Sequence, residues 1–139
     1  MRPLRLLFAA AIVSLFVLSA CSQQQKPTVR EAFESEGIRL TETETPAETE
    51  LNGVKPDSFK LDNEETVRVY TFDTKANRKL AAERLRERQR LLSSFPPLLY
   101  EAEQILVLYY GQTDSGSVPM KQDDTAFGVK IRKAVERLE

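Results

Sequence analysis

Residues suited to chemistry are scarce in this chain, which holds one cysteine and no histidine among its 139 residues. A single cysteine excludes disulfides within the chain, and the lack of histidine excludes Ser–His–Asp and Cys–His catalytic sets. Zinc and copper would lack the nitrogen and sulfur ligands that they prefer. The five scattered glycines form no phosphate-binding loop. The sequence therefore predicts no catalytic residue, no cofactor and no metal site, and leaves Cys21 as the residue of chief interest.

The residues before Cys21 have the layout of a secretory signal peptide. A positive head, Arg2 and Arg5, precedes an apolar run of thirteen residues, 6–18, which only Ser14 interrupts. A membrane-spanning helix needs about 20 apolar residues, so this run predicts export rather than a span. We expect residues 1–20 to be a signal peptide.

The end of this segment, Leu18-Ser19-Ala20-Cys21, resembles the lipobox of bacterial lipoproteins. In that class the cysteine sulfur receives a diacylglyceryl group, and cleavage then leaves the cysteine as the first residue. Two acyl chains, for example palmitate, give stable membrane attachment. The resemblance implies anchoring on the extracytoplasmic face of the cell membrane, with residues 21–27 as lipidated cysteine and polar tether. The alternative is an ordinary secretory signal followed by a chance cysteine.

Three amphipathic helices are expected in residues 28–139, which have the length of one domain. The first ends at Gly37 and the second at about Leu92. The expected N-caps are Thr28 with Glu31 as its capping-box partner, Asp73 or Thr74, and Asp123 or Asp124. The apolar stripes are Leu80, Ala81, Leu85, Leu91 and Leu92 in the second helix, and Phe127, Ile131, Ala134, Val135 and Leu138 in the third.

Alternating apolar residues predict two β-hairpins between these helices. The first pairs residues 59–61 with 67–72 after a turn at Asn52-Gly53, and the second pairs residues 98–102 with 105–110. Residues 105–110 are apolar on both faces, which indicates a central strand. The acidic residues 41–50, TETETPAETE, form a solvated loop, an edge strand or a cation-binding strip. The expected fold is α+β, a small antiparallel sheet of two hairpins with helices packed on one face.

The second helix is strongly basic, with a net charge of +5 over residues 75–90. Such charge invites an anionic surface, and the candidate contact residues are Arg78, Lys79, Arg84, Arg86, Arg88 and Arg90. The alternative is compensation within the fold, because residues 30–50 carry a net charge of −5 and could face this helix. Removal of residues 1–20 leaves a net charge of only −3, which gives no argument for nucleic-acid binding.

Two further groups of residues are candidate sites. The aromatic residues Tyr70, Phe72, Tyr100, Tyr109 and Tyr110 could stack on a ligand or sit in the core, and adjacent Tyr109 and Tyr110 must point to opposite faces of a strand. A hydrolase would need two converging carboxylates, and the candidates are Asp57, Asp62, Glu101, Asp114 and Asp124.

Much of residues 1–111 resembles small lipoproteins of Bacillus-like Gram-positive bacteria, a group without an assigned activity. The resemblance lies in the lipobox and in the segments KPTVREAFESEGI, LNGVKPDSFKL, VRVYTFDTKANRKLAAERL and ILVLYYG. No activity is carried over from this group; the anchor and the scarcity of catalytic groups predict a lipid-anchored binding or interaction module of the cell envelope. The expected partners are the membrane, through the anchor, and an envelope protein or an anionic surface polymer. A small carboxylate enzyme and a solute-binding accessory lipoprotein are the alternatives, and the oligomeric state is open.

Overall fold

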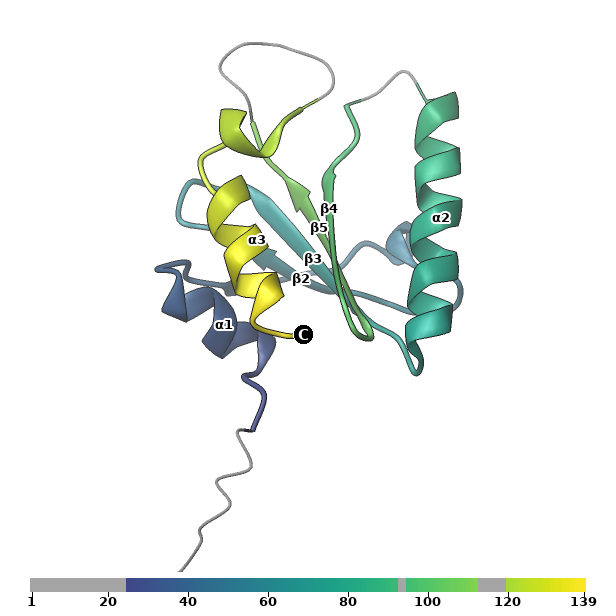
Figure 1. The fold of residues 1–139 in the computed structure, drawn as a ribbon. Coiled ribbons are helices and arrows are strands. Elements are labelled where there is room, and N and C mark those ends of the chain that lie inside the picture. Colours follow the sequence, from purple (N-terminus) through teal and green to yellow (C-terminus); the bar gives the residue numbers. More distant parts are fainter. Residues whose placement is uncertain (1–24, 93–94, 113–119) are drawn as a thin grey trace, which may run out of the picture.

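The structure, a computed structural model, describes residues 25–92, 95–112 and 120–139 (Figure 1). Its elements follow one another as α1 (Val29–Ser35), β1 (Thr41–Thr43), the 3₁₀ turn η1 (Ala47–Thr49), β2 (Asp57–Lys60), β3 (Thr66–Thr71), α2 (Lys75–Leu91), β4 (Leu98–Ala102), β5 (Ile105–Tyr110), the 3₁₀ turn η2 (Gln122–Asp124) and α3 (Gly128–Glu136). The predicted α+β class is confirmed.

The sheet has five strands in the order β1-β2-β3-β5-β4, and every neighbouring pair is antiparallel. Both predicted hairpins are present, β2 with β3 and β4 with β5. As expected, β5 is an inner strand, because it lies between β3 and β4. The acidic segment 41–50 supplies the short edge strand β1 at its start.

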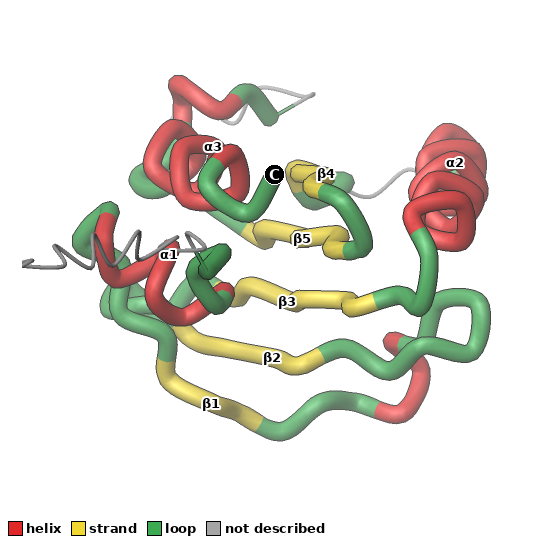
Figure 2. The backbone as a smooth tube through the Cα atoms, turned by 60° about the horizontal axis from the view of Figure 1, so that its bottom comes forward, coloured by secondary structure: helices red, strands yellow, loops and turns green. Residues whose placement is uncertain are grey.

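The helices cover both faces of the sheet, whereas the sequence placed them on one (Figure 2). Helices α1 and α3 pack on the face that carries Val107 and Tyr109, and α2 packs on the face that carries Leu106 and Leu108. Successive side chains of a strand point to opposite faces. Because β5 has apolar side chains on both faces of the sheet, helices must pack on both faces. Helices on one face alone would leave half of the β5 side chains in water.

Local signals set the starts of two helices as predicted. The Thr28 side chain accepts from the N–H of Glu31, and the Glu31 carboxylate accepts from the N–H of Thr28, so the capping box of α1 is complete. Thr74 caps α2 by accepting from the N–H of Asn77. Gly37, just beyond α1, has a φ of 75°, which the missing Cβ permits.

The predicted start of the last helix is wrong. Asp123 and Asp124 lie in η2, and α3 begins only at Gly128, whose N–H donates to Thr125 Oγ1 at 3.0 Å. A Cβ at position 128 would lie 2.5 Å from the carbonyl oxygen of Gln122, so the glycine lets η2 fold against the start of α3. The apolar stripe itself is confirmed, because Ile131, Ala134, Val135 and Leu138 are buried; Phe127 packs against them.

Candidate functional site

Helix α2 meets the sheet through a face that matches its predicted apolar stripe only in part. Its buried residues are Arg78, Ala81 and Ala82, and Leu85 is half-buried. Of the predicted stripe, Ala81 and Leu85 are therefore at the sheet, whereas Leu80, Leu91 and Leu92 are exposed. Two small alanines let the helix approach the sheet, while an arginine occupies the inner position one turn earlier. The apolar periodicity of α2 does not predict the burial of Arg78, because its partner Glu101 lies on β4, 23 positions later in the sequence.

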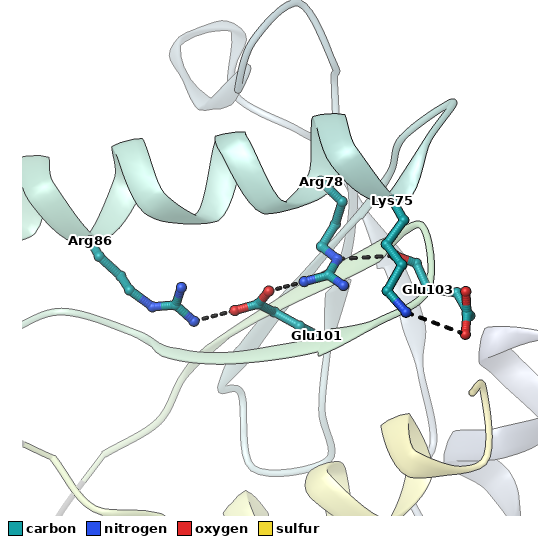
Figure 3. A network of polar contacts seen from close by, with 5 residues as sticks. All are labelled: Lys75, Arg78, Arg86, Glu101 and Glu103. Carbon is teal, nitrogen blue, oxygen red and sulfur yellow. Dashed lines mark hydrogen bonds and ion pairs between the residues drawn. The ribbon is translucent and has the colours of Figure 1, made fainter.

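Arg78 is the centre of a polar network that joins α2 to the β4–β5 hairpin (Figure 3). Its side chain is only 5% exposed; one guanidinium nitrogen donates to the Glu101 carboxylate, and Nε donates to the carbonyl oxygen of Glu103 at 3.0 Å. Arg86 donates to the other oxygen of Glu101. Lys75 lies 3.8 Å from the Glu103 carboxylate. Three cations of the basic helix are therefore engaged by the sheet, and Arg78 is withdrawn from the predicted anionic-surface contact.

The other four cations of α2 are exposed, and we call them together the cationic face: Lys79, Arg84, Arg88 and Arg90. At about 100° per residue, Lys79 and Arg90 lie on one flank of the outward side of the helix and Arg84 and Arg88 on the other, with the exposed Glu83 and Glu87 between them. Within the parts of the chain that the structure describes, no carboxylate forms an ion pair with any of them. Arg84 alone has a side-chain partner, a neutral one, since it donates to Asn52 Oδ1 at 3.1 Å. Asn52 and Gly53 both have positive φ, which confirms the predicted turn and brings Asn52 beside α2.

The acidic segment 30–50 does not neutralise this helix through ion pairs. Its carboxylates that form such pairs bind elsewhere: Glu42 lies 3.2 Å from Arg30, and Glu36 lies 2.8 Å from Arg137 of the α3 C-cap. Among the described residues, no ion pair joins residues 30–50 to residues 75–90. The charge of α2 is compensated in part by the β4–β5 hairpin instead, through Glu101 and Glu103, which the sequence did not indicate.

The aromatic residues are mainly core, with one at the rim. Tyr70, Phe72, Tyr100 and Tyr109 are buried, and Tyr110 is half-buried. This confirms the prediction that Tyr109 and Tyr110 divide between core and rim. Tyr70 donates to the carbonyl oxygen of Thr49 at 2.6 Å, and burial raises the pKa of Tyr70 to about 12. These rings support the fold rather than offer a stacking platform.

The candidate carboxylates do not form a catalytic pair in the described residues. Asp57, Asp62 and Asp124 are exposed on different elements, and Glu101 is held by two arginines. Asp114 lies outside the described residues. In the described part of the chain, no group of three acidic, cysteine or histidine side chains is placed to hold a metal ion.

A buried carboxylate that the sequence did not single out is Glu65, which is 5% exposed at the start of β3. One of its oxygens accepts from the Tyr109 hydroxyl, and the other accepts from the N–H of Gln112 at 2.8 Å. Burial, and then the contact with Glu65, raise the pKa of Tyr109 above its ordinary value. Glu65 sits in the polar run Asn63-Glu64-Glu65, which reads as a turn, so no local signal marks it as buried.

The predicted lipidation site Cys21 and the lipobox residues Leu18, Ser19 and Ala20 lie outside the described residues, as does the signal peptide 1–20. Of the helices that are described, none is long and apolar enough to cross a bilayer. Comparison of the chain with protein-family models, with curated proteins and with solved structures finds no match.

Proposed function

We propose that this chain is a lipid-anchored binding module on the extracytoplasmic face of the cell membrane, and that it presents the cationic face of α2 to an anionic partner. Support for the anchor comes from the sequence: a positive head, an apolar run too short to span a bilayer, and Leu18-Ser19-Ala20-Cys21. The anchor would hold the domain at the membrane through Cys21 and leave α2 available to a partner in the cell envelope.

The observation that carries the binding role is the exposed charge of α2. Like charges four residues apart, as at Arg84 and Arg88, destabilise an isolated helix by about 0.2–0.5 kcal/mol. Nothing in the described fold offsets this repulsion with an ion pair to the cationic face. An anionic ligand would relieve it, and each cation near an anionic surface contributes about 1 kcal/mol of attraction.

The environment of Glu101, the one partly buried carboxylate among the candidates that the structure describes, favours binding over catalysis. Glu101 has both oxygens occupied by arginines, so it is held as an ion pair and is not positioned to exchange a proton with a substrate. The role of Glu101 is to fix α2 on the sheet, which in turn fixes where the cationic face points.

The anchor is tested by mass spectrometry of the protein extracted from its native host. We expect an N-terminal peptide that begins at Cys21 and carries a diacylglyceryl group on sulfur. A free thiol at Cys21, or a chain that still begins at Met1, would remove the proposed location.

The cationic face is tested on the lipidated full chain, held in nanodiscs of neutral phosphatidylcholine and titrated with polyglutamate. We expect replacement of Lys79, Arg84, Arg88 and Arg90 by Gln to weaken binding at least tenfold and to flatten its salt dependence, because exposed charges are screened. The matched control removes four exposed cations from other elements by Gln substitution: Arg39, Lys55, Lys121 and Arg132. Equal weakening in both variants would show an effect of net charge alone and would remove α2 as the binding face.

A further inference from the structure

The outer edge of β4 carries backbone groups without a partner in the described fold. Strand β4 ends the sheet, with β5 on one side only, and lies between α3 and α2 (Figure 2). The N–H of Phe72, directly after β3, donates to the carbonyl oxygen of Gln104, so the even-numbered residues of β5 bond to β3 and the odd-numbered ones to β4. Their partners on β4 are Leu98, Tyr100 and Ala102. The N–H and C=O groups of Leu99 and Glu101 therefore point outward, and no backbone hydrogen bond from the described residues reaches them.

One flank of α2 brings positive charge to this edge. Arg86 reaches over to the carboxylate of Glu101 on β4 (Figure 3). At about 100° per residue, Lys79 and Arg90 lie within about 40° of Arg86 around the helix axis and further from the buried residues. Glu83 lies further round, between the two flanks of the helix. Three cations of α2 therefore lie on the side of the helix that faces the free edge of β4.

We propose that the free edge of β4 binds an extended segment of another protein that carries acidic side chains at alternate positions. The proposal rests on the proposed function and names its partner class. The outward groups of β4 are donors and acceptors in the repeat of a strand, which an extended backbone matches, whereas a simple polyanion brings acceptors alone. Every second side chain of the added strand points to the face that α2 covers. Acidic side chains there would meet the cations on the near flank of α2.

The fold limits this pairing to a short strand and disfavours a second copy as the partner. Pro97, the next outward position before Leu99, has no N–H, and the carbonyl oxygen of Glu103, the next after Glu101, accepts from Arg78. Antiparallel pairing of β4 with the β4 of a second copy would place both α2 helices on the same face of the joined sheet. Their basic flanks would then face each other, and like charges brought together at an interface are repulsive.

The test uses the lipidated full chain in neutral phosphatidylcholine nanodiscs and two labelled synthetic peptides, with fluorescence anisotropy as the readout. The first peptide alternates Glu with Thr. The second has the same side chains and an N-methyl group on every residue, which removes its N–H donors and keeps its charge. We expect the second peptide to bind at least about tenfold more weakly than the first.

Two pairs of variants locate the site on the protein. Leu99→Pro removes one outward N–H and leaves the bonds to β5 in place, so it should weaken binding of the first peptide at least about tenfold. Leu99→Val keeps the N–H and should weaken binding less than about threefold. Lys79→Gln with Arg90→Gln should weaken it at least about tenfold, and Arg84→Gln with Arg88→Gln, an equal loss of charge on the other flank, less than about threefold. Circular dichroism checks the fold of each variant, and should Leu99→Pro not fold, the two peptides and the flank variants still decide.

Three other results would overturn the proposal. Equal binding of the two peptides would assign α2 to polyanions and leave the proposed function standing. Equal weakening by the two pairs of Gln substitutions would mean that the peptide does not lie along the β4 side of α2. Self-association of the chain that Leu99→Pro abolishes would assign the edge to a second copy. The proposed function has its own test with polyglutamate, so the two can fail separately.

Discussion

At the scale of single residues, the structure depends on two polar contacts that local sequence does not reveal. Arg78 reaches Glu101 across 23 positions of the chain, and Glu65 reaches Tyr109 across 44. Each residue looks solvent-exposed in its own segment, one in a basic helix and one in a polar turn. Each is buried through a contact with a strand that comes later in the sequence, β4 for Arg78 and β5 for Glu65. The residue pattern of the segment alone therefore cannot predict the burial.

Removing the partner of Glu101 should destabilise the domain strongly. Arg78→Met keeps much of the buried stem but leaves the Glu101 carboxylate with Arg86 alone. The expected loss is about 2–3 kcal/mol, below the roughly 3–5 kcal/mol of a fully buried pair because Glu101 is 22% exposed. The measurement is urea unfolding of the full chain, followed by circular dichroism. Adding Glu101→Gln should recover part of the loss, because it removes the partly buried carboxylate charge and leaves only Arg86 unpaired, whose side chain is 50% exposed.

The control for this prediction breaks an exposed ion pair of the same kind. Lys60 and Glu64 lie 2.7 Å apart with side chains that are 48% and 78% exposed, so Lys60→Met should cost about 0–1 kcal/mol. A loss in Arg78→Met no larger than this would mean that the network does not hold α2 to the sheet.

The Glu65 contact predicts a difference between two Tyr→Phe substitutions. Tyr109→Phe leaves a buried carboxylate with one donor fewer, and we expect a loss of about 2–3 kcal/mol. Tyr100→Phe, also buried, removes a bond to the neutral carbonyl of Gly128 and should cost about 1 kcal/mol. Urea unfolding of the two variants gives the comparison. The reverse order, with Tyr100→Phe the costlier, would contradict a structural role for Glu65.

At the scale of elements, the sequence predicts correctly the features that depend on residues close together in the chain. The capping box of α1, the Thr74 cap of α2 and both hairpins depend on residues a few positions apart, and all are present. The face of α2 that meets the sheet and the start of α3 depend on tertiary contacts; the first agrees with expectation only in part, and the second differs from it. The candidate site follows the same rule. The sequence shows that α2 is basic, but it does not show which of its cations form ion pairs with the β4–β5 hairpin and which are exposed.

The two confirmed caps predict equal costs when they are removed. Thr28→Ala and Thr74→Ala should each lower the free energy of unfolding by about 1 kcal/mol, because each leaves an N–H of the first turn without a partner. Thr41→Ala, at an exposed position of the edge strand β1, should change it by less than about 0.5 kcal/mol. Thermal or urea unfolding measures all three. A cap variant that matches Thr41→Ala would show that its helix is held by packing alone.

At the scale of the whole molecule, the sheet is the central layer, with a buried cluster that contains tyrosine on each of its faces. Helices α1 and α3 close one face and α2 closes the other, so the core is shared by two apolar clusters (Figure 2). Hydroxyls of three buried tyrosines bond inside this core, to Thr49, Gly128 and Glu65. The residues of the proposed binding surface, in contrast, are exposed on α2, where substitutions change charge without opening the core.

The buried tyrosines predict that the domain loses stability in alkaline solution. Burial raises the pKa of Tyr70 to about 12 and raises the pKa values of Tyr100 and Tyr109 as well. Above the unfolded tyrosine pKa of about 10, the unfolded chain has released protons that the folded chain still holds, so unfolding is favoured as the pH rises. The contribution of Tyr70 to the free energy of unfolding is fully present below pH 10. Between about pH 10 and pH 12 it declines by about 1.4 kcal/mol per pH unit. Urea unfolding at pH 8, 9, 10 and 11 measures the slope, and Tyr70→Phe should reduce it above pH 10, since phenylalanine has no proton to lose. Parallel curves for the two proteins over this range would mean that the Tyr70 hydroxyl is accessible to water in the folded domain.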